Sequence, residues 1–362
     1  MNGTVFLTGA TGYIGASLLG KWLESTGARL VLLARGKRGD DPRKRVMGAL
    51  SALYPAGGAE RFSSRIEVVE GDVSFDRFGL DEDRYRGLAS RVSHVIHCAA
   101  AARFDLELDE ARRTNVGGTR NVLDFGRACR ALRRIDYIGT AYVAGKRLGI
   151  VREDELDEGQ EHNNTYERSK MEAEALVRDG MRELPIAISR PSVVICDSRT
   201  GRASSYNGFF RALRMYWLGA LKVLPGNPSG AMDLVPVDYV TEAVYAISNR
   251  PSSAGACHHL TAGLSNATSL EEIAELASLH FGKERFAIVP PAEFVSYVSG
   301  MRDTLGEKEL AMIDEIMLYM PYLGGGLEFD NAGAVRATGL EAPPVRSYFG
   351  RMAEYIRATA KP

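Results

Sequence analysis

Short apolar runs alternate with longer amphipathic stretches through the first half of the chain. The apolar runs predict six strands, at 5–7, 29–34, 66–70, 92–98, 134–138 and 185–189. Apolar residues with a helical period predict helices between them, at 14–24, 43–54, 110–130 and 166–183. Right-handed strand–helix–strand crossovers place helices on both faces of a parallel sheet. The pattern therefore predicts an α/β fold, a Rossmann-type doubly wound parallel sheet that binds ligands at the carboxyl ends of its strands.

The pattern changes at about residue 196, where segments rich in Gly and Ser interrupt the helices. Further helices are predicted at 208–221, 237–248, 270–281 and 346–358. We predict an NADP-binding domain over 1–195, with an insert at 36–65, and a smaller, mostly helical substrate lobe over 196–362. Segments around 233–250 are those expected to pack back onto the first domain.

Composition narrows the class of protein. The 362 residues are 45% hydrophobic and 25% charged with a net charge of −1, which gives no global attraction to nucleic acid or an anionic membrane. The four cysteines lack metal-ligand spacing, so we expect no metal site and a reducing, cytoplasmic location. No run of 18 apolar residues and no signal peptide is present, so no transmembrane span is expected.

A glycine-rich turn follows the first strand, in the sequence Thr8-Gly9-Ala10-Thr11-Gly12-Tyr13-Ile14-Gly15. Glycines allow the amides at a helix start to approach a pyrophosphate without side-chain collision. The GxxGxxG spacing departs from the GxGxxG of ordinary dinucleotide enzymes, and a plain strand–helix turn is the alternative. The strand before it and the amphipathic helix after it favour cofactor binding. The predicted cofactor-binding residues here are Thr8, Gly9, Thr11, Gly12, Tyr13, Ile14 and Gly15.

The end of the second strand bears on the choice of cofactor. An acidic residue there would bind the ribose hydroxyls of NAD, whereas arginine suits a 2′-phosphate. This chain has Arg35 at that position, no acid beside it, and Arg45 ten residues further on. Arginine makes forked, charge-assisted contacts with phosphate, so NADPH is the predicted cofactor. The alternative is a solvated basic loop that includes Lys37 and Arg38.

Tyr166 and Lys170 lie four residues apart, on one face of the predicted helix. A nearby cation makes a phenol a better proton donor near neutral pH. Thr140 follows the fifth strand and is predicted to face the same crevice, where its hydroxyl could hold a substrate carbonyl; Tyr142 is a weaker rival. With the glycine turn, the pair indicates nicotinamide-dependent oxidoreductase chemistry, with Thr140, Tyr166 and Lys170 as the predicted catalytic residues.

Other strand-end residues are predicted to line the cofactor crevice. Asp72 could accept from the adenine amine, or could simply cap a turn. Asn115, beside two glycines in a predicted helix, indicates a kink or a relay to Lys170, with a locally satisfied side chain as the alternative. His97 is interpreted as a packed strand-end histidine. The remaining predicted cofactor contacts are Val73, Cys98, Ala99 and Ala100, with Pro191, Ser192 and Val193 near the nicotinamide.

These motifs resemble those of the extended short-chain dehydrogenases/reductases, in the branch of fatty acyl reductases and thioester reductase domains. The similar segments are Ala34-Arg35 with Arg45, the insert before Gly71-Asp72-Val73, Arg103-Phe104, Asn164-Thr165-Tyr166, Arg190-Pro191-Ser192 and Leu234-Val235-Pro236-Val237-Asp238-Tyr239-Val240. The resemblance implies hydride delivery from NADPH to an acyl thioester, on coenzyme A or on an acyl or peptidyl carrier protein met in trans. It implies that Thr140 and Tyr166 hold the carbonyl oxygen while Lys170 binds the ribose; Gly139 departs from the usual serine.

The same machinery serves nucleotide-sugar epimerases or dehydratases and hydroxysteroid or ketone reductases, so these stay as alternatives. The apolar stretch 209–221 favours an acyl chain, although a helix packed into the core is the competing interpretation. The predicted substrate residues are Arg103, Phe104, Tyr142, Phe209, Phe210, Leu213 and Trp217. A redox-sensing binding protein is disfavoured because the Tyr–Lys pair is kept. Aldehyde and alcohol both stay open as products.

Overall fold

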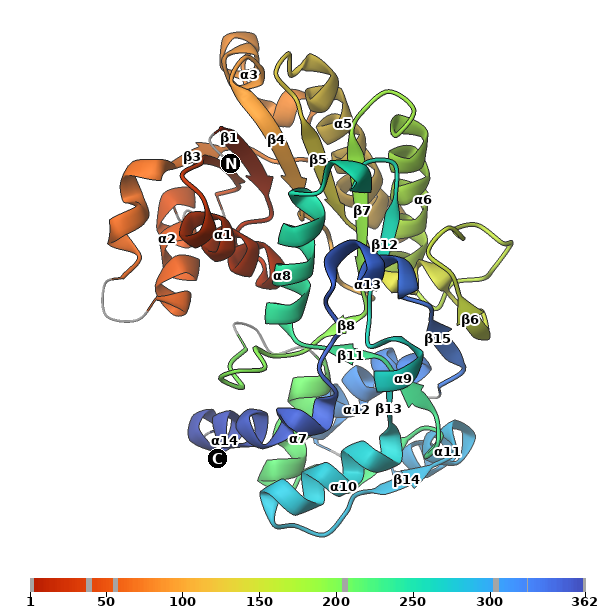
Figure 1. Cartoon of the computed structure of the whole chain (residues 1–362). Helices are drawn as coiled ribbons and strands as arrows, with labels where there is room; N and C mark the ends of the chain where they lie inside the picture. The colour runs from red at the N-terminus through yellow and green to blue at the C-terminus, as the bar shows by residue number, and fades with distance from the viewer. Residues whose placement is uncertain are drawn as a thin grey trace.

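A seven-stranded parallel sheet forms the core of the upper part of the molecule in Figure 1. The computed structural model describes residues 3–36, 41–54, 58–203, 208–301, 306–323 and 325–360. The strand order is β12-β7-β5-β4-β1-β2-β3. The strands are β1 (Thr4–Thr8), β2 (Arg29–Ala34), β3 (Ile66–Glu70), β4 (Val92–His97), β5 (Arg134–Ile138), β7 (Ile186–Pro191) and β12 (Cys257–Leu260). The predicted doubly wound fold is confirmed.

Helices bury both faces of this sheet. One apolar cluster joins the sheet to α1 (Tyr13–Ser25), α2 (Pro42–Leu53) and α8 (Val237–Ser248). A second cluster, on the other face, joins it to α3 (Glu82–Ala89), α5 (Gly118–Ala128) and α6 (Thr165–Gly180). Strands buried on both faces explain why their sequences are nearly continuous apolar runs rather than alternating ones.

The predicted helix at 110–130 is interrupted. Its residues form α4 (Leu108–Arg112), a π-helical turn η3 (Arg113–Gly117) and then α5. A Cβ on Gly118 would lie 2.9 Å from the Val73 side chain, so glycine allows α5 to approach the loop after β3. π-Turns inside helices are rare and recur at functional sites. Asn115, where a kink or a relay was predicted, lies within this π-turn.

The segment after 196 contributes more to the sheet than its sequence indicates. β12 pairs in parallel with β7, and α8 packs against α1. We did not predict β12, because a four-residue strand with two histidines, Cys257–Leu260, lacks an apolar run. Residues from both sides of 196 thus build the central sheet and its helices, and a division at 195/196 stays a prediction.

The helices in the rest of the C-terminal half are α7 (Gly208–Leu218), α9 (Gly263–Asn266), α10 (Leu270–Phe281), α11 (Pro291–Met301), α12 (Glu307–Tyr319), α13 (Ala332–Thr338) and α14 (Phe349–Thr359). Of these, α7, α10, α11, α12 and α14 surround an apolar cluster of their own, whereas α13 packs against α8 and β12. Short strand pairs connect them: β8 (Val193–Val194) with β11 (Leu234–Val235), β9 (Val223–Pro225) with β14 (Ala287–Val289), β10 (Ala231–Met232) with β13 (Thr268–Ser269), and β6 (Gly149–Val151) with β15 (Leu327–Phe329). None of the helices in the described part of the chain combines the length and apolarity that a membrane span requires.

Candidate active site

The glycine turn between β1 and α1 is built so tightly that side chains are excluded at two positions. Gly9 has φ +79°, and a Cβ there would lie 2.6 Å from the Ala99 amide nitrogen. A Cβ on Gly15 would lie 2.0 Å from the Gly9 carbonyl oxygen. Gly12 is the N-cap of α1 and has no side chain to compete for the first amides of the helix. These amides and the helix dipole suit a pyrophosphate.

Several predicted contact residues around this turn use their side chains within the protein. The Thr8 hydroxyl accepts from the Ala99 amide at 3.2 Å and bonds His97 Nδ1 at 2.8 Å. The Tyr13 hydroxyl donates to the Ile195 carbonyl at 2.8 Å, and Ile14 packs against the core. The hydroxyls of Thr8 and Tyr13 are therefore occupied. A cofactor could contact the backbone of both residues and the aromatic ring of Tyr13.

The fourth strand ends in groups that stay neutral near pH 7. Burial lowers the pKa of His97 to about 3, and its Nε2 lies 3.2 Å from the Thr119 hydroxyl. Burial raises the pKa of the Cys98 thiol to about 12. His97 thus matches the interpretation of a packed strand-end histidine.

A basic cluster lies at the ends of β2 and β3. Arg45 of α2 donates to the Arg35 carbonyl at 2.5 Å and to the Thr11 hydroxyl at 3.5 Å. The Arg35 guanidinium lies 3.4 Å from Asp72. Asp72 also accepts from the amide and hydroxyl of Ser74, at 2.9 and 2.8 Å, which is the turn role considered as its alternative. Lys37 and Arg38 lie outside the described residues.

Thr140 and Tyr166 line a common cavity. Thr140 begins the turn η4 (Ala141–Ala144) after β5, and Tyr166 lies in the first turn of α6. Burial raises the pKa of Tyr166 to about 12, although a hydrogen bond with the Thr140 side chain acts in the opposite direction. The phenol therefore keeps its proton at neutral pH.

Lys170 lies one helical turn beyond Tyr166, fully within the protein. Its ammonium donates to the Ile138 carbonyl at 2.9 Å and lies 4.3 Å from the centre of the Tyr137 ring. Burial lowers the pKa of Lys170 to about 8. The charges that act on the phenol, at Cys98 and Glu167, raise its pKa in the same direction as burial. The role of Lys170 in keeping Tyr166 acidic stays a prediction.

Asn115 connects the π-turn to the site. Its side-chain oxygen accepts from the Ala101 amide at 2.8 Å, and its amide donates to the Ala101 carbonyl at 3.2 Å and to the Ser169 hydroxyl at 2.9 Å. Asn115 is thus satisfied within the protein and braces α6 beside Lys170. Its side chain also fixes the loop that continues from Cys98, Ala99 and Ala100.

The end of β7 is fixed by two buried carboxylates. Arg190 is fully buried and pairs with Glu174 of α6 at 2.6 and 2.9 Å. The Ser192 hydroxyl donates to Asp233 at 2.5 Å, and the same carboxylate accepts from the Ala262 amide at 2.7 Å. Burial raises the pKa of Asp233 to about 6. Asp233 was not predicted as a site residue. It directly precedes the family-like segment 234–240 but belongs to no recognisable motif.

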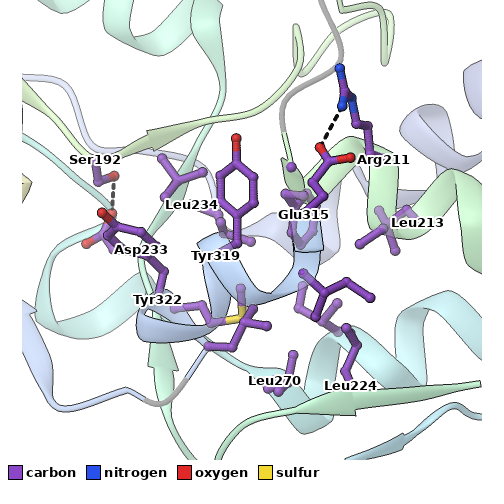
Figure 2. A pocket seen from close by; sticks show the side chains of 18 of the residues that line it. Ser192, Arg211, Leu213, Leu224, Asp233, Leu234, Leu270, Glu315, Tyr319 and Tyr322 are labelled. Carbon is purple, nitrogen blue, oxygen red and sulfur yellow. Dashed lines mark hydrogen bonds and ion pairs between the residues drawn. The ribbon is translucent and has the colours of Figure 1, made fainter. Parts of the chain in front are cut away.

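The cavity measures about 250 Å³ and extends from Tyr166 into the C-terminal half. Figure 2 shows its wall, with Ser192 and Asp233 at one end and the Arg211–Glu315 pair, 2.8 Å apart, at another. Between them the wall is mainly aliphatic, including Leu213, Leu224, Leu234, Leu270 and Ile273. Of the other residues near β7, Val193 lines the cavity and Pro191 ends the strand.

Four of the seven predicted substrate residues line this cavity: Phe104, Tyr142, Phe209 and Leu213. The other three do not. Phe210 is buried in the core, and Trp217 stacks on Phe281 with centroids 5.6 Å apart. Both residues lie on α7 near Leu213, but neither takes part in the cavity wall. Arg103 pairs with Asp105 at 2.6 Å outside it.

An aromatic group from distant parts of the chain lies at the Thr140–Tyr166 end of the cavity. The Phe104 ring lies 5.7 Å from Tyr166, 5.2 Å from Tyr319 and 5.5 Å from Tyr322. Tyr319 ends α12, and Tyr322 belongs to the following turn η7 (Met320–Tyr322). Neither tyrosine was predicted from the sequence as a site residue.

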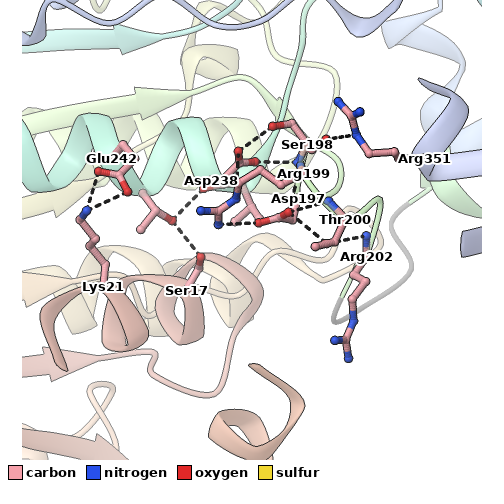
Figure 3. Close-up of polar contacts among 12 residues, drawn as sticks. Ser17, Lys21, Asp197, Ser198, Arg199, Thr200, Arg202, Asp238, Glu242 and Arg351 are labelled. Carbon is pink, nitrogen blue, oxygen red and sulfur yellow. Dashed lines mark hydrogen bonds and ion pairs between the residues drawn. The ribbon is translucent and has the colours of Figure 1, made fainter. Parts of the chain in front are cut away.

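Away from the cavity, polar contacts link α1, α8, the segment 197–202 and α14 (Figure 3). Lys21 of α1 pairs with Glu242 of α8 at 2.6 Å. Asp238, at the start of α8, accepts from the Ser198 amide at 2.8 Å and its hydroxyl at 2.6 Å. Arg351 of α14 donates to the Ser198 carbonyl at 2.7 Å. The C-terminal helix is thereby tied to the segment that leaves β8.

The chain is similar to several known proteins. The model of the family described as Male sterility protein matches residues 7–244. The non-canonical nonribosomal peptide synthetase cpsA of Aspergillus campestris is 31% identical over 71% of this chain and 25% of that protein. The putative fatty acyl-CoA reductase CG8303 of Drosophila melanogaster is 27% identical over 80% of this chain and 60% of that protein. This chain thus spans about a quarter of the length of the first relative and three fifths of the second.

Solved structures show the same arrangement. The terminal R domain from the myxalamid PKS-NRPS biosynthetic pathway has a TM-score of 0.86 and 28% identity, over 99% of this chain and 91% of that one. UDP-glucuronic acid 4-epimerase from Bacillus cereus, in complex with NAD, has a TM-score of 0.71 and 17% identity, over 99% and 100% of the two chains. The second likeness is one of fold.

Proposed function

Because this chain belongs to the Male sterility protein family, in the fatty acyl and thioester reductase branch of the extended short-chain dehydrogenases/reductases, we propose that it reduces an acyl thioester with NADPH. The observation that carries the proposal is the mainly aliphatic cavity that ends at Thr140 and Tyr166. An acyl chain in this cavity would bring its carbonyl oxygen to the two hydroxyls. The names of the relatives, a fatty acyl-CoA reductase and peptide synthetases, support the same class of substrate.

The residues around the glycine turn fit a nicotinamide dinucleotide. Gly9, Gly12 and Gly15 leave room for a pyrophosphate at the start of α1. Arg35 and Arg45 converge at the end of β2, where the ribose of such a cofactor lies in this fold. Their charge favours a 2′-phosphate, which supports NADPH rather than NADH. NADPH, when bound, supplies the hydride.

The proposed catalytic steps use three side chains. Thr140 and Tyr166 bind the thioester carbonyl oxygen, and Tyr166 gives it a proton as hydride reaches the carbonyl carbon. The product of this step is a hemithioacetal, whose C–S bond then breaks to give an aldehyde and a free thiol. A phenol with a pKa of about 12 is protonated at pH 7 and so enters as a proton donor. Lys170, with a pKa of about 8, is mainly an ammonium at pH 7 and is proposed to bind the ribose.

The cavity wall disfavours the nucleotide-sugar alternative. A nucleoside diphosphate requires several donors or cations, whereas the charged groups on this wall are Asp233, Glu315 and Arg211, and the last is paired with Glu315. An acyl chain requires only apolar surface, and each buried CH₂ contributes roughly 0.8 kcal/mol. Coenzyme A and a carrier protein are equally compatible with the wall, since both would carry the thioester on a chain outside it.

The test is to incubate the protein with NADPH and acyl-CoA thioesters of graded length, and with the same acyl groups on a carrier protein. Thiol release and NADPH consumption are followed together, and products are identified by mass spectrometry. One NADPH per thiol indicates an aldehyde, and two indicate an alcohol. Turnover of a ketone or nucleotide sugar without any thiol release would refute the thioester assignment.

A further inference from the structure

Tyr322 lies in the C-terminal half, yet its hydroxyl forms hydrogen bonds with residues at the start of α6, the helix that carries Tyr166. The hydroxyl donates to the Glu167 carboxylate at 2.5 Å and accepts from the Asn164 side-chain amide at 2.7 Å. Asn164 is the N-cap of α6, and its oxygen accepts from the Glu167 amide at 3.0 Å. Asn164, Glu167 and Tyr322 thus form a closed ring of hydrogen bonds. Asn164 and Glu167 flank Tyr166 in the sequence.

Glu167 is fully buried and accepts hydrogen bonds both from this ring and from Asn163. Besides Tyr322, it accepts from the Asn163 amide at 2.7 Å and from the Asn163 side chain at 3.2 Å. Loss of one donor to a buried carboxylate destabilises the fold. The groups that donate to Glu167 are therefore held firmly in place. Burial and the neighbouring carboxylate raise the pKa of Tyr322, and its hydroxyl therefore keeps its proton and donates.

The aromatic ring of Tyr322 lines the cavity. It packs against Phe104 and, edge to face, against Tyr142, with centroids 5.5 and 4.9 Å apart. Figure 2 shows Tyr322 with Tyr319 on the short helical segment that borders the cavity. One side chain therefore contacts both the acyl-binding space and the cap of α6.

We propose that Tyr322 is a positioning residue for Tyr166, acting through Glu167 and Asn164 to fix the first turn of α6. The first turn of a helix frays when its cap is lost, and Tyr166 is the second residue of α6. Proton transfer in the active site requires the phenol to be held within a fraction of an ångström, so a small displacement lowers kcat. The inference rests on the proposed function for its kinetic test only.

The kinetic test separates the hydroxyl from the ring. Tyr322→Phe keeps the cavity wall, so we expect kcat to fall by roughly 10- to 100-fold with KM for the acyl substrate within about twofold. Glu167→Leu, which removes the acceptor, is expected to lower kcat as well, and Tyr322→Phe should cost much less in that background, because the two act through one contact. Equal losses in both backgrounds, or a kcat within twofold of the wild type, would overturn the proposal.

A second measurement does not require the substrate. Hydrogen exchange should be faster at the amides of 163–168 in Tyr322→Phe, whereas the matched control Tyr245→Phe should leave them unchanged. Tyr245 is on α8, where its hydroxyl donates to the Ser25 carbonyl at 3.4 Å. If the wild type turns over no thioester, the proposed function fails and exchange alone decides the role of Tyr322. Unchanged protection at 163–168 would refute that role.

Discussion

Replacing Arg35 by alanine tests the cofactor assignment most directly. Its guanidinium would contact a 2′-phosphate that NADPH has and NADH lacks, so the two cofactors report on one interaction. A charge-assisted hydrogen bond contributes about 1.5–3 kcal/mol. The Arg35 side chain is 62% exposed and already lies 3.4 Å from Asp72, which places the expected loss at the lower end. We therefore expect NADPH to bind about tenfold more weakly, and NADH to change by less than about twofold.

Binding is measured by fluorescence titration of each nucleotide at low and high salt. Arg43→Ala is the matched control, because Arg43 is an exposed arginine on α2 that takes no part in the Arg35–Arg45 contact. Because the contact is exposed, the NADPH effect should shrink as ionic strength rises. Asp72→Asn should act in the opposite sense and tighten NADPH binding by up to about fivefold. Equal losses for NADPH and NADH in Arg35→Ala would refute the 2′-phosphate site.

Three further variants test the chemistry and the framework. Tyr166→Phe should lower kcat by roughly 10²- to 10⁴-fold while the NADPH dissociation constant stays within about threefold; near-native turnover would exclude Tyr166 as the proton donor. The ammonium of Lys170 is lost as pH rises through a pKa of about 8, so kcat/KM should fall on the alkaline side, and Lys170→Arg should move that fall to higher pH. Glu174→Ala leaves the buried Arg190 without its ion pair and should cost about 3–5 kcal/mol in urea unfolding, against less than about 1 kcal/mol for the exposed Glu183→Ala. A loss at Glu174 no larger than at Glu183 would contradict the importance of the buried pair.

Features set by short-range geometry could be read from the sequence. The glycine turn, the strands β1 to β7 of the main sheet and the Tyr166–Lys170 spacing each depend on residues close together in the chain. Parallel strands end at one edge of a sheet, so the residues that follow them were expected to share a crevice. For this reason Thr140 and Tyr166 were expected at one site, and they line one cavity in the structure. The family resemblance, which depends on the same motifs, is confirmed.

The tertiary structure decided what depends on distant segments and on burial. α7 is apolar on more than one face, so only packing shows that Phe209 and Leu213 face the cavity while Phe210 and Trp217 do not. Burial, which no local motif encodes, gives Tyr166 and Lys170 their shifted pKa values. Tyr322 reaches Glu167 across 155 residues of sequence. Such contacts depend on how the chain folds back on itself, because a hydrogen bond or an apolar contact selects a partner by position in space and not by spacing along the chain.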